Sequence, residues 1–539
     1  MGALRLVVTA CVLVGCGGGG GDDEPPPDAP DVVEMPELDL DLREQVARME
    51  TGMLTSADLT NGYFGRIERR DAPTTGTHAF ITLDLNARTI AATVDGMRGG
   101  GKLLQGAVIV LKDNIDTAGL ATTAGSRALA QNVPSTDATL VAKLRAANAV
   151  ILGKGNLSEW ANFRGNMSTS GWSSLGDQTR HPLVKSFSPC GSSSGSAAAV
   201  RDGTISAAIG TETNGSIICP SSINGIVGFK PTVGLVSRAG IIPISSTQDT
   251  AGPMAKTVGD VARLLRVIAG PDAADPATNA IPMNMSFDFE AGLASASLAG
   301  KRLGVVRSIP FDSGTNAVFE MQLQRIAAAG AILVDVSLPD VSTFGADEFT
   351  LLTFEFKDGI NAYLTSHARP NQPASLADLI NYNNANSNVV LRYFGQELFI
   401  QSEATTGLAT QAYIDAKQRA RMATLDNGIL AVMAANNLDA LISPSTGPSW
   451  VINYQTGDTG TQVASAHAAI AGCPHLTIPM GAVMGMPVGL SLVARPFEDA
   501  KVIELGYAYE QLRGPVSARV ETTVPLAQPP LTPRDMAGM

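Results

Sequence analysis

Short apolar runs alternate with segments of helical periodicity along this chain, and this alternation constrains the fold more than any other feature of the sequence. Residues 107–111 (AVIVL) are continuously apolar, as in strands buried on both faces of a sheet, and residues 139–147 have the apolar spacing of a helix. Further strands are expected at 149–152, 302–306, 332–336, 438–442, 476–478 and 488–493, and further helices at 254–269 and 318–330. The pattern predicts an α/β protein in which helices cover both faces of a central sheet.

Two other parts of the chain are also expected to be helical. Thr55 precedes Asp58 by three residues, which is typical of a helix N-terminus, and Leu59, Tyr63 and Ile67 follow at helical spacing. Residues 345–425 are mainly helical in pattern, with weak periodicity.

Composition and charge limit the classes of function. The chain has 539 residues, of which 45% are hydrophobic and 16% charged, so it can bury a sizeable core. Its net charge is −12 and it contains no long basic run, which argues against nucleic acid as a partner. No apolar run reaches the length of a membrane-spanning helix.

The N-terminus resembles the signal of a bacterial lipoprotein. Arg5 precedes a short apolar region, and Leu13-Val14-Gly15-Cys16 is similar to a lipobox, which implies cleavage before Cys16 and acylation of its thiol. Residues 17–30 are rich in Gly, Asp and Pro and are typical of a tether. We therefore expect an exported, cell-envelope protein that a lipid attaches to a membrane. The expected segments are a signal peptide at 1–15, a tether at 16–37, one large domain at 38–520 with a more variable, mainly helical part at 270–425, and an irregular tail at 521–539.

Cysteine and histidine residues give no sign of a metal site. Three cysteines remain beyond the signal region, Cys190, Cys219 and Cys473, and the five histidines are scattered, so we predict no metal and no cofactor. Isolated cysteines in apolar stretches are usually small buried side chains. Export also permits a disulfide, so a bridge between Cys190 and Cys219 stays open.

The segment PCGSSSGSAAAV, residues 189–200, can be interpreted in several ways. A flexible linker is disfavoured because the segment leads directly into apolar residues 197–200 and 205–209, which are expected to be buried. The pattern G-x-S-x-G around Ser193 matches a nucleophile elbow, but the polar residues 184–189 before it do not form the strand that an elbow requires. A second Gly- and hydroxyl-rich turn follows at 210–217. Lys112, at a strand end, is a candidate base because a buried lysine loses its proton more easily.

Three motifs together resemble the amidase signature family. They are Lys112-Asp113-Asn114, Gly191-Ser192-Ser193-Ser194-Gly195-Ser196, and the segment from Gly210 to Ile217, and the family spacing of 24 residues separates Ser192 from Ser216. The resemblance covers most of the chain after about residue 40 and is stronger still to the bacterial peptide amidases, for example at Asn156 to Phe163. It implies a single large domain with a central mixed β-sheet and helices on both faces.

The resemblance also implies a catalytic site. The family's Ser–cis-Ser–Lys triad maps onto Ser216 as nucleophile, Ser192 as bridging serine and Lys112 as base. Backbone amides of Thr213, Asn214, Gly215 and Ser216 would form the oxyanion hole. Asp113 and Ser193 are candidate supporting residues, and Asp113 could either orient Lys112 or cap the following turn.

The expected reaction is hydrolysis of a carboxamide through an acyl-enzyme, with peptide amides deamidated at their C-terminus and ammonia released. Amidases for aryl, fatty or small aliphatic amides are the alternative, because Asn214 and Ile218 flank the nucleophile where the family usually has other residues. An amidotransferase A-type subunit disagrees with the export signal, and a lipid-anchored binding protein without activity has no use for Lys112, Ser192 and Ser216. The expected partner is thus a small-molecule or peptide amide, with membrane attachment by lipid alone, and the oligomeric state is open.

Overall fold

The computed structural model describes residues 35–367 and 372–514. The chain divides into two units, residues 1–35 and 36–539, and the sheet and helices below belong to the second. The predicted signal peptide, Cys16, nearly all of the predicted tether, and the tail from residue 515 lie outside the described residues. Within these residues, none of the helices combines the length and the apolar character needed to cross a membrane.

A mixed sheet of eleven strands forms the centre of the domain, in the order β1-β3-β2-β6-β8-β7-β12-β13-β11-β9-β10. Parallel pairing joins β2 to β3 and β6, and joins β9 to β10 and β11. The other neighbouring pairs in the sheet are antiparallel. The strands are β1 Phe80–Leu83, β2 Val108–Lys112, β3 Val150–Gly155, β6 Ala207–Glu212, β7 Val227–Lys230, β8 Thr250–Ala255, β9 Arg302–Val306, β10 Ile332–Val336, β11 Ala440–Pro444, β12 His475–Val483 and β13 Met486–Val493, with a separate hairpin of β4 Trp172–Ser173 and β5 Asp177–Gln178.

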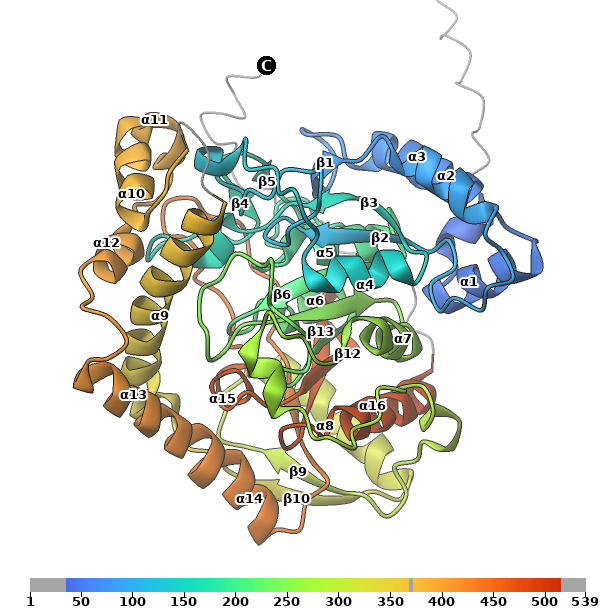
Figure 1. Ribbon diagram of the computed structural model, residues 1–539. Helices are drawn as coiled ribbons and strands as arrows, with labels where there is room; N and C mark the ends of the chain where they lie inside the picture. Colours follow the sequence, from blue (N-terminus) through green and yellow to red (C-terminus); the bar gives the residue numbers. More distant parts are fainter. Residues whose placement is uncertain (1–34, 368–371, 515–539) are drawn as a thin grey trace, which may run out of the picture. The chain divides into compact units, whose positions relative to one another are not determined.

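Helices cover both faces of the sheet (Figure 1). Leu476 and Ile478 of β12 lie against α16, whereas Thr477 between them lies on the side of α6, so these two helices occupy opposite faces. Helix α5 packs with α6, and helices α4, α7 and α8 join α16 through successive contacts. The helices are α1 Leu42–Thr51, α2 Ser56–Arg70, α3 Ala87–Asp95, α4 Thr139–Ala146, α5 Ser194–Asp202, α6 Ile218–Asn224, α7 Val258–Ile268, α8 Ser313–Ala328, α9 Gly345–Ser366, α10 Leu376–Ala385, α11 Ser387–Val390, α12 Glu397–Glu403, α13 Gln411–Arg421, α14 Ala431–Ala435, α15 Ala466–Ile470 and α16 Asp499–Arg513.

The predicted fold class is confirmed, with one error in the elements. Residues 254 and 255, expected to begin a helix, end strand β8, and the helix α7 starts only after its N-cap Thr257. Gly252 and Pro253 disfavour a strand by intrinsic propensity, but β8 pairs with β6 along its length and with β7 at residues 254 and 255, and it lies in the interior of the sheet. Tertiary pairing therefore overrides the local preference.

The predicted helical part at 345–425 is present as α9 to α13, which Figure 1 shows in yellow and orange on one flank of the domain. Phe356 and Ile360 of α9 are fully buried in a cluster with Trp160 and Phe163, and with Ile242 of the segment that follows β7. This packing brings α9 to the edge of the sheet at which β2 and β6 end, where the candidate site lies.

Candidate active site

Three polar side chains of the site lie at the ends of the neighbouring parallel strands β2 and β6. Lys112 is the last residue of β2, and Thr211 and Glu212 are the last two of β6. Because parallel strands end at the same edge, these side chains meet although 99 residues separate Lys112 from Thr211. Residues 108–112 are buried at every position, which explains why the strand before Lys112 is continuously apolar.

The amine of Lys112 is fully buried and has no carboxylate within hydrogen-bonding distance among the described residues. Its Nζ lies 2.8 Å from Ser192 Oγ, 2.8 Å from Thr211 Oγ1 and 3.1 Å from the Thr211 carbonyl oxygen. Burial lowers the pKa of Lys112 to about 7, against the opposing effect of the charges on Glu212 and Asp249. A neutral amine has two N–H donors and one lone pair. It can therefore donate to both Thr211 oxygens and accept the Ser192 proton.

Ser192 lies in the turn that leads into α5, and its peptide bond with Gly191 is cis. The Ser192 side chain is fully buried against Lys112. The next residue holds this turn to the neighbouring one, because Ser193 N–H donates to the Ser216 carbonyl at 3.1 Å and Ser193 Oγ donates to the Thr211 carbonyl at 3.0 Å. The segment that resembles a spacer in composition is thus a fixed turn between core elements.

Ser216 occupies the turn between β6 and α6. Glu212 Oε2 accepts the N–H groups of Ile217 (2.7 Å) and Ile218 (2.9 Å), which fixes the backbone directly after the serine. Gly215 has a φ of +83°, a left-handed conformation that favours glycine. Ser216 is 7% exposed, and its hydroxyl makes no hydrogen bond within the described residues. The hydroxyl is therefore available to a substrate.

The same turn presents free backbone donors. The N–H groups of Asn214, Gly215 and Ser216 have no acceptor among the described residues. The side chain of Asn214 fixes their orientation, because its Nδ2 donates to Glu348 of α9 at 2.7 Å and its Oδ1 accepts from Ser465 Oγ at 2.6 Å. Burial raises the pKa of Glu348.

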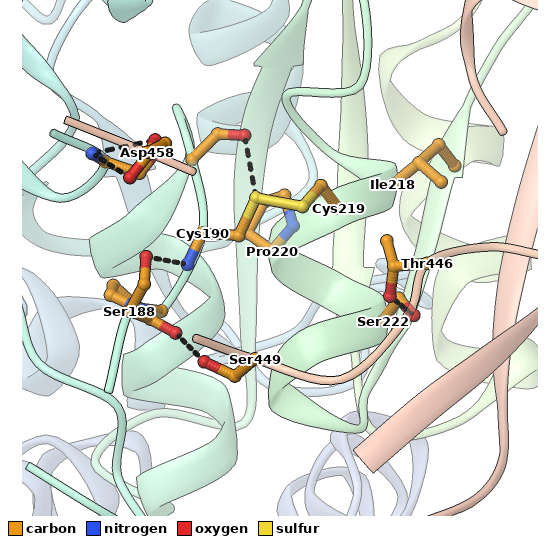
Figure 2. The surroundings of a disulfide bond; sticks show 12 residues. Ser188, Cys190, Ile218, Cys219, Pro220, Ser222, Thr446, Ser449 and Asp458 are labelled. Atoms are coloured by element: carbon orange, nitrogen blue, oxygen red, sulfur yellow. Dashed lines mark hydrogen bonds between the residues drawn. A yellow bond between two sulfur atoms is a disulfide. The ribbon is translucent and has the colours of Figure 1, made fainter. Parts of the chain in front are cut away.

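A disulfide joins the two serine-bearing segments. Cys190, two residues before Ser192, is bonded to Cys219, three residues after Ser216 (Figure 2). Hydrogen bonds hold its surroundings, since Cys190 N–H donates to Ser188 Oγ at 3.1 Å and Ser449 Oγ donates to the Ser188 carbonyl at 2.6 Å. Of the two alternatives that the sequence left open for these cysteines, the structure contains the bridge, and Cys473 is a buried free thiol.

Ser192 and Ser216 open into one cavity of about 410 Å³. Its walls come from the segment after β7, which supplies Ile241, Ile242, Pro243 and Ile244, and from α9. Thr213 also lines it, whereas Asn214 and Gly215 are not among the lining residues. The cavity combines apolar walls with a few convergent polar groups, as substrate sites do.

The two supporting residues proposed from the sequence differ in their partners. Ser193 joins its own turn to Ser216 and to Thr211 of β6, as described above. Asp113 does not contact the Lys112 amine, because its carboxylate pairs with Lys154 at 3.3 Å and accepts the hydroxyl of Thr123.

Three residues of the site were not expected from the sequence motifs: Thr211, Glu212 and Glu348. Thr211 and Glu212 directly precede the expected oxyanion residues in the sequence, and this position could have indicated that they belong to the site. No group of three or more His, Cys, Asp and Glu residues that could hold a metal occurs in residues 35–367 and 372–514.

Comparisons with known proteins show what the whole chain is similar to. The family model described as Amidase matches residues 58–503. The solved structure of a native peptide amidase from Stenotrophomonas maltophilia is 48% identical with a TM-score of 0.85, over 89% of this chain and 98% of that one. A probable amidase of Arabidopsis thaliana is 37% identical over 76% of this chain and 77% of its own. The A subunit of a glutamyl-tRNA(Gln) amidotransferase from Symbiobacterium thermophilum is 34% identical over 88% of this chain and 96% of its own.

Proposed function

The chain belongs to the amidase family and is a hydrolase of amide C–N bonds, and from this premise we propose that it removes the C-terminal amide of peptides and releases ammonia. The observation that carries the proposal is the hydrogen bond between the Lys112 amine and Ser192. The amine is buried with no carboxylate in contact among the described residues, and Ser192 and Ser216 line one cavity. The similarity to a peptide amidase over nearly its whole length supports the choice of substrate. The amidotransferase relative is less similar, and the lipobox-like residues 13–16 disfavour a role on tRNA.

The proposed mechanism begins with proton transfer towards Lys112. The neutral amine takes the Ser192 proton while Ser192 takes the Ser216 proton, and Ser216 Oγ attacks the carbonyl carbon. The described residues hold no hydrogen bond between the two hydroxyls, and such contacts commonly tighten when substrate binds. The C–N bond then breaks as the protons return through Ser192 to the leaving nitrogen. Water hydrolyses the acyl-enzyme by the same path.

Charge on the tetrahedral oxygen would be stabilised by the unpaired N–H groups of the Ser216 turn. Removal of one such donor in an enzyme of this kind typically costs about 3 kcal/mol of transition-state stabilisation. Glu212 and Glu348 contribute by holding the turn, and neither needs to touch the substrate.

The test is ammonia release by purified wild type and Ser216→Ala across peptide amides, free amino-acid amides, fatty amides and benzamide. We expect peptide amides to be the fastest substrates and the variant to lose at least about 10³-fold in rate. Native rates in Ser216→Ala would refute the nucleophile. A fatty or aromatic amide as the fastest substrate would instead refute the peptide class and favour the alternative substrates.

We also propose that the protein is an exported lipoprotein acylated at Cys16. The lipobox-like residues 13–16 support this, and so does the disulfide, because such bonds persist in oxidising compartments. Cys16→Ser should abolish lipid labelling and move the protein from the membrane fraction. Unchanged labelling would contradict the assignment.

A further inference from the structure

The cavity beside Ser216 has an excess of negative charge. Five charged side chains line it: Arg238, Asp249, Asp275, Glu355 and Asp358. Four are carboxylates, and Arg238 is the one cation among these lining residues. A cavity lined by one sign of charge within apolar walls concentrates ligands of the opposite sign.

Arg238 is not available to bind a substrate anion. Its Nε and Nη2 donate to the two carboxylate oxygens of Asp275 at 2.8 and 2.7 Å, and its Nη1 donates to the Ser246 carbonyl. Such a two-bond pair is geometrically satisfied and largely neutral. The remaining three carboxylates therefore determine the sign of the charge that a substrate meets.

Two of these carboxylates are held by the protein. Asp249 accepts the Thr213 hydroxyl and two backbone N–H groups, and Glu355 accepts the Tyr413 hydroxyl at 2.7 Å and further donors from residues 245 and 247. Asp358 differs from both. It is exposed, and it makes no side-chain hydrogen bond or salt bridge within the described residues, while the side chain of its neighbour Lys357 contacts Glu403.

Asn114 places a buried acceptor without a partner beside the same cavity. It lines the cavity, is 4% exposed, and donates through Nδ2 to Thr211 at 3.0 Å, while its Oδ1 has no hydrogen-bond partner in the described part of the chain. A buried acceptor of this kind is costly unless a ligand supplies a donor. The N–H groups of a carboxamide are such donors.

We propose that the cavity selects amides of cationic substrates, with Asp358 at its exposed edge binding an ammonium or guanidinium group of the molecule whose amide is cleaved at Ser216. This inference rests on the proposed function and adds the charge class of the substrate to it. The cation could be a basic side chain on the amidated residue or the free α-amine of a short peptide.

The experiment compares three dipeptide amides by kcat/KM for ammonia release. Acetyl-Gly-Arg amide carries a side-chain cation, acetyl-Gly-citrulline amide replaces it by an uncharged group of nearly the same shape, and Gly-citrulline amide carries only the α-amine. We expect kcat/KM for one or both cationic peptides to exceed that for the neutral peptide about tenfold, and by less in 0.5 M NaCl. The peptide that shows the preference identifies whether the side chain or the α-amine is bound. Equal rates for all three would overturn the proposal.

Variants attribute the preference to Asp358. Asp358→Asn should reduce the ratio of cationic to neutral kcat/KM to about twofold or less. Glu50→Gln is the matched control, because Glu50 is an exposed residue of α1 outside the cavity and the substitution changes the net charge equally. An unchanged ratio in Asp358→Asn, or an equal loss in Glu50→Gln, would overturn the role of Asp358.

Binding to Ser216→Ala, measured by calorimetry with the arginine and citrulline peptides, separates this proposal from the proposed function. Tighter binding of the cationic peptide together with no ammonia release by wild type would leave the cation site standing and refute the peptide amidase. Equal binding of both, with ammonia released from both by wild type, would refute the cation site and leave the function standing.

Discussion

The buried amine of Lys112 predicts how activity depends on pH. Only the neutral amine can accept the Ser192 proton, so kcat/KM should follow the deprotonated fraction of Lys112. With the pKa of Lys112 near 7, about half of the free enzyme is competent at pH 7, and activity should fall about tenfold for each pH unit below about 6. At the ordinary lysine pKa, about 0.03% would be competent at pH 7, so burial raises the active fraction by about 10³.

The assay is initial-rate ammonia release from a neutral peptide amide between pH 5 and 9, with stability checked at each pH by return to pH 8. A single acidic limb with a midpoint near 7 is expected. A rate that still rises tenfold per pH unit between pH 8 and 9, or a flat profile, would show that the lowered pKa of Lys112 does not determine the pH dependence.

Asp249→Asn identifies which group titrates. Burial raises the pKa of Asp249 to about 6, so this carboxyl could produce an acidic limb of its own. The charge on Asp249 also raises the pKa of Lys112. If Lys112 is the titrating group, the limb persists in Asp249→Asn and moves to lower pH. Disappearance of the limb would assign it to Asp249 instead.

Two further predictions concern the support of the Ser216 turn. Glu348→Ala should lower kcat about 10- to 100-fold with little change in KM, because Asn214 loses the acceptor that orients the turn. Glu348→Gln keeps an oxygen acceptor and should restore most of kcat. Full kcat in the alanine variant would show that Asn214 does not need this hydrogen bond. Replacing both Cys190 and Cys219 by serine opens a crosslink between residues 29 apart and should lower the free energy of unfolding by about 3.5 kcal/mol in urea titrations. An unchanged transition would mean that the bridge adds no stability.

Local sequence carried enough information for the sheet and for the position of the candidate triad. Lys112 follows a continuously apolar strand, and Ser192 and Ser216 lie in short Gly-rich turns with a recognisable spacing, so each could be located within a few residues. Residues joined by long-range packing could not be found this way. Glu348 lies 134 residues from Asn214 in a segment of weak periodicity, and nothing near it indicates the contact.

Pairing between elements accounts for the other differences. The partner of Asp113 is Lys154 because β2 and β3 are adjacent parallel strands, an arrangement that neither motif contains. Strand β8 includes Gly252, where a Cβ atom would lie 2.0 Å from the Phe229 carbonyl oxygen, so a residue unfavourable to strands is required by the neighbouring strand. The cysteine pairing likewise depends on how two loops meet.

The burial of Lys112 also affects the stability of the fold. The unfolded chain holds a proton on this lysine up to about pH 10.5, whereas the folded protein releases it near pH 7, so the free energy of unfolding rises with pH between these values. At pH 7 the difference amounts to a cost of about 4 kcal/mol to the folded state, a large share of the stability of an ordinary domain. The disulfide and the packing of α9 contribute stability against this cost of burying the candidate base. Lowering the pH from 10.5 towards 7 is therefore expected to lower the free energy of unfolding. Lowering the pH below 7 is expected to abolish activity, because the same amine of Lys112 becomes protonated.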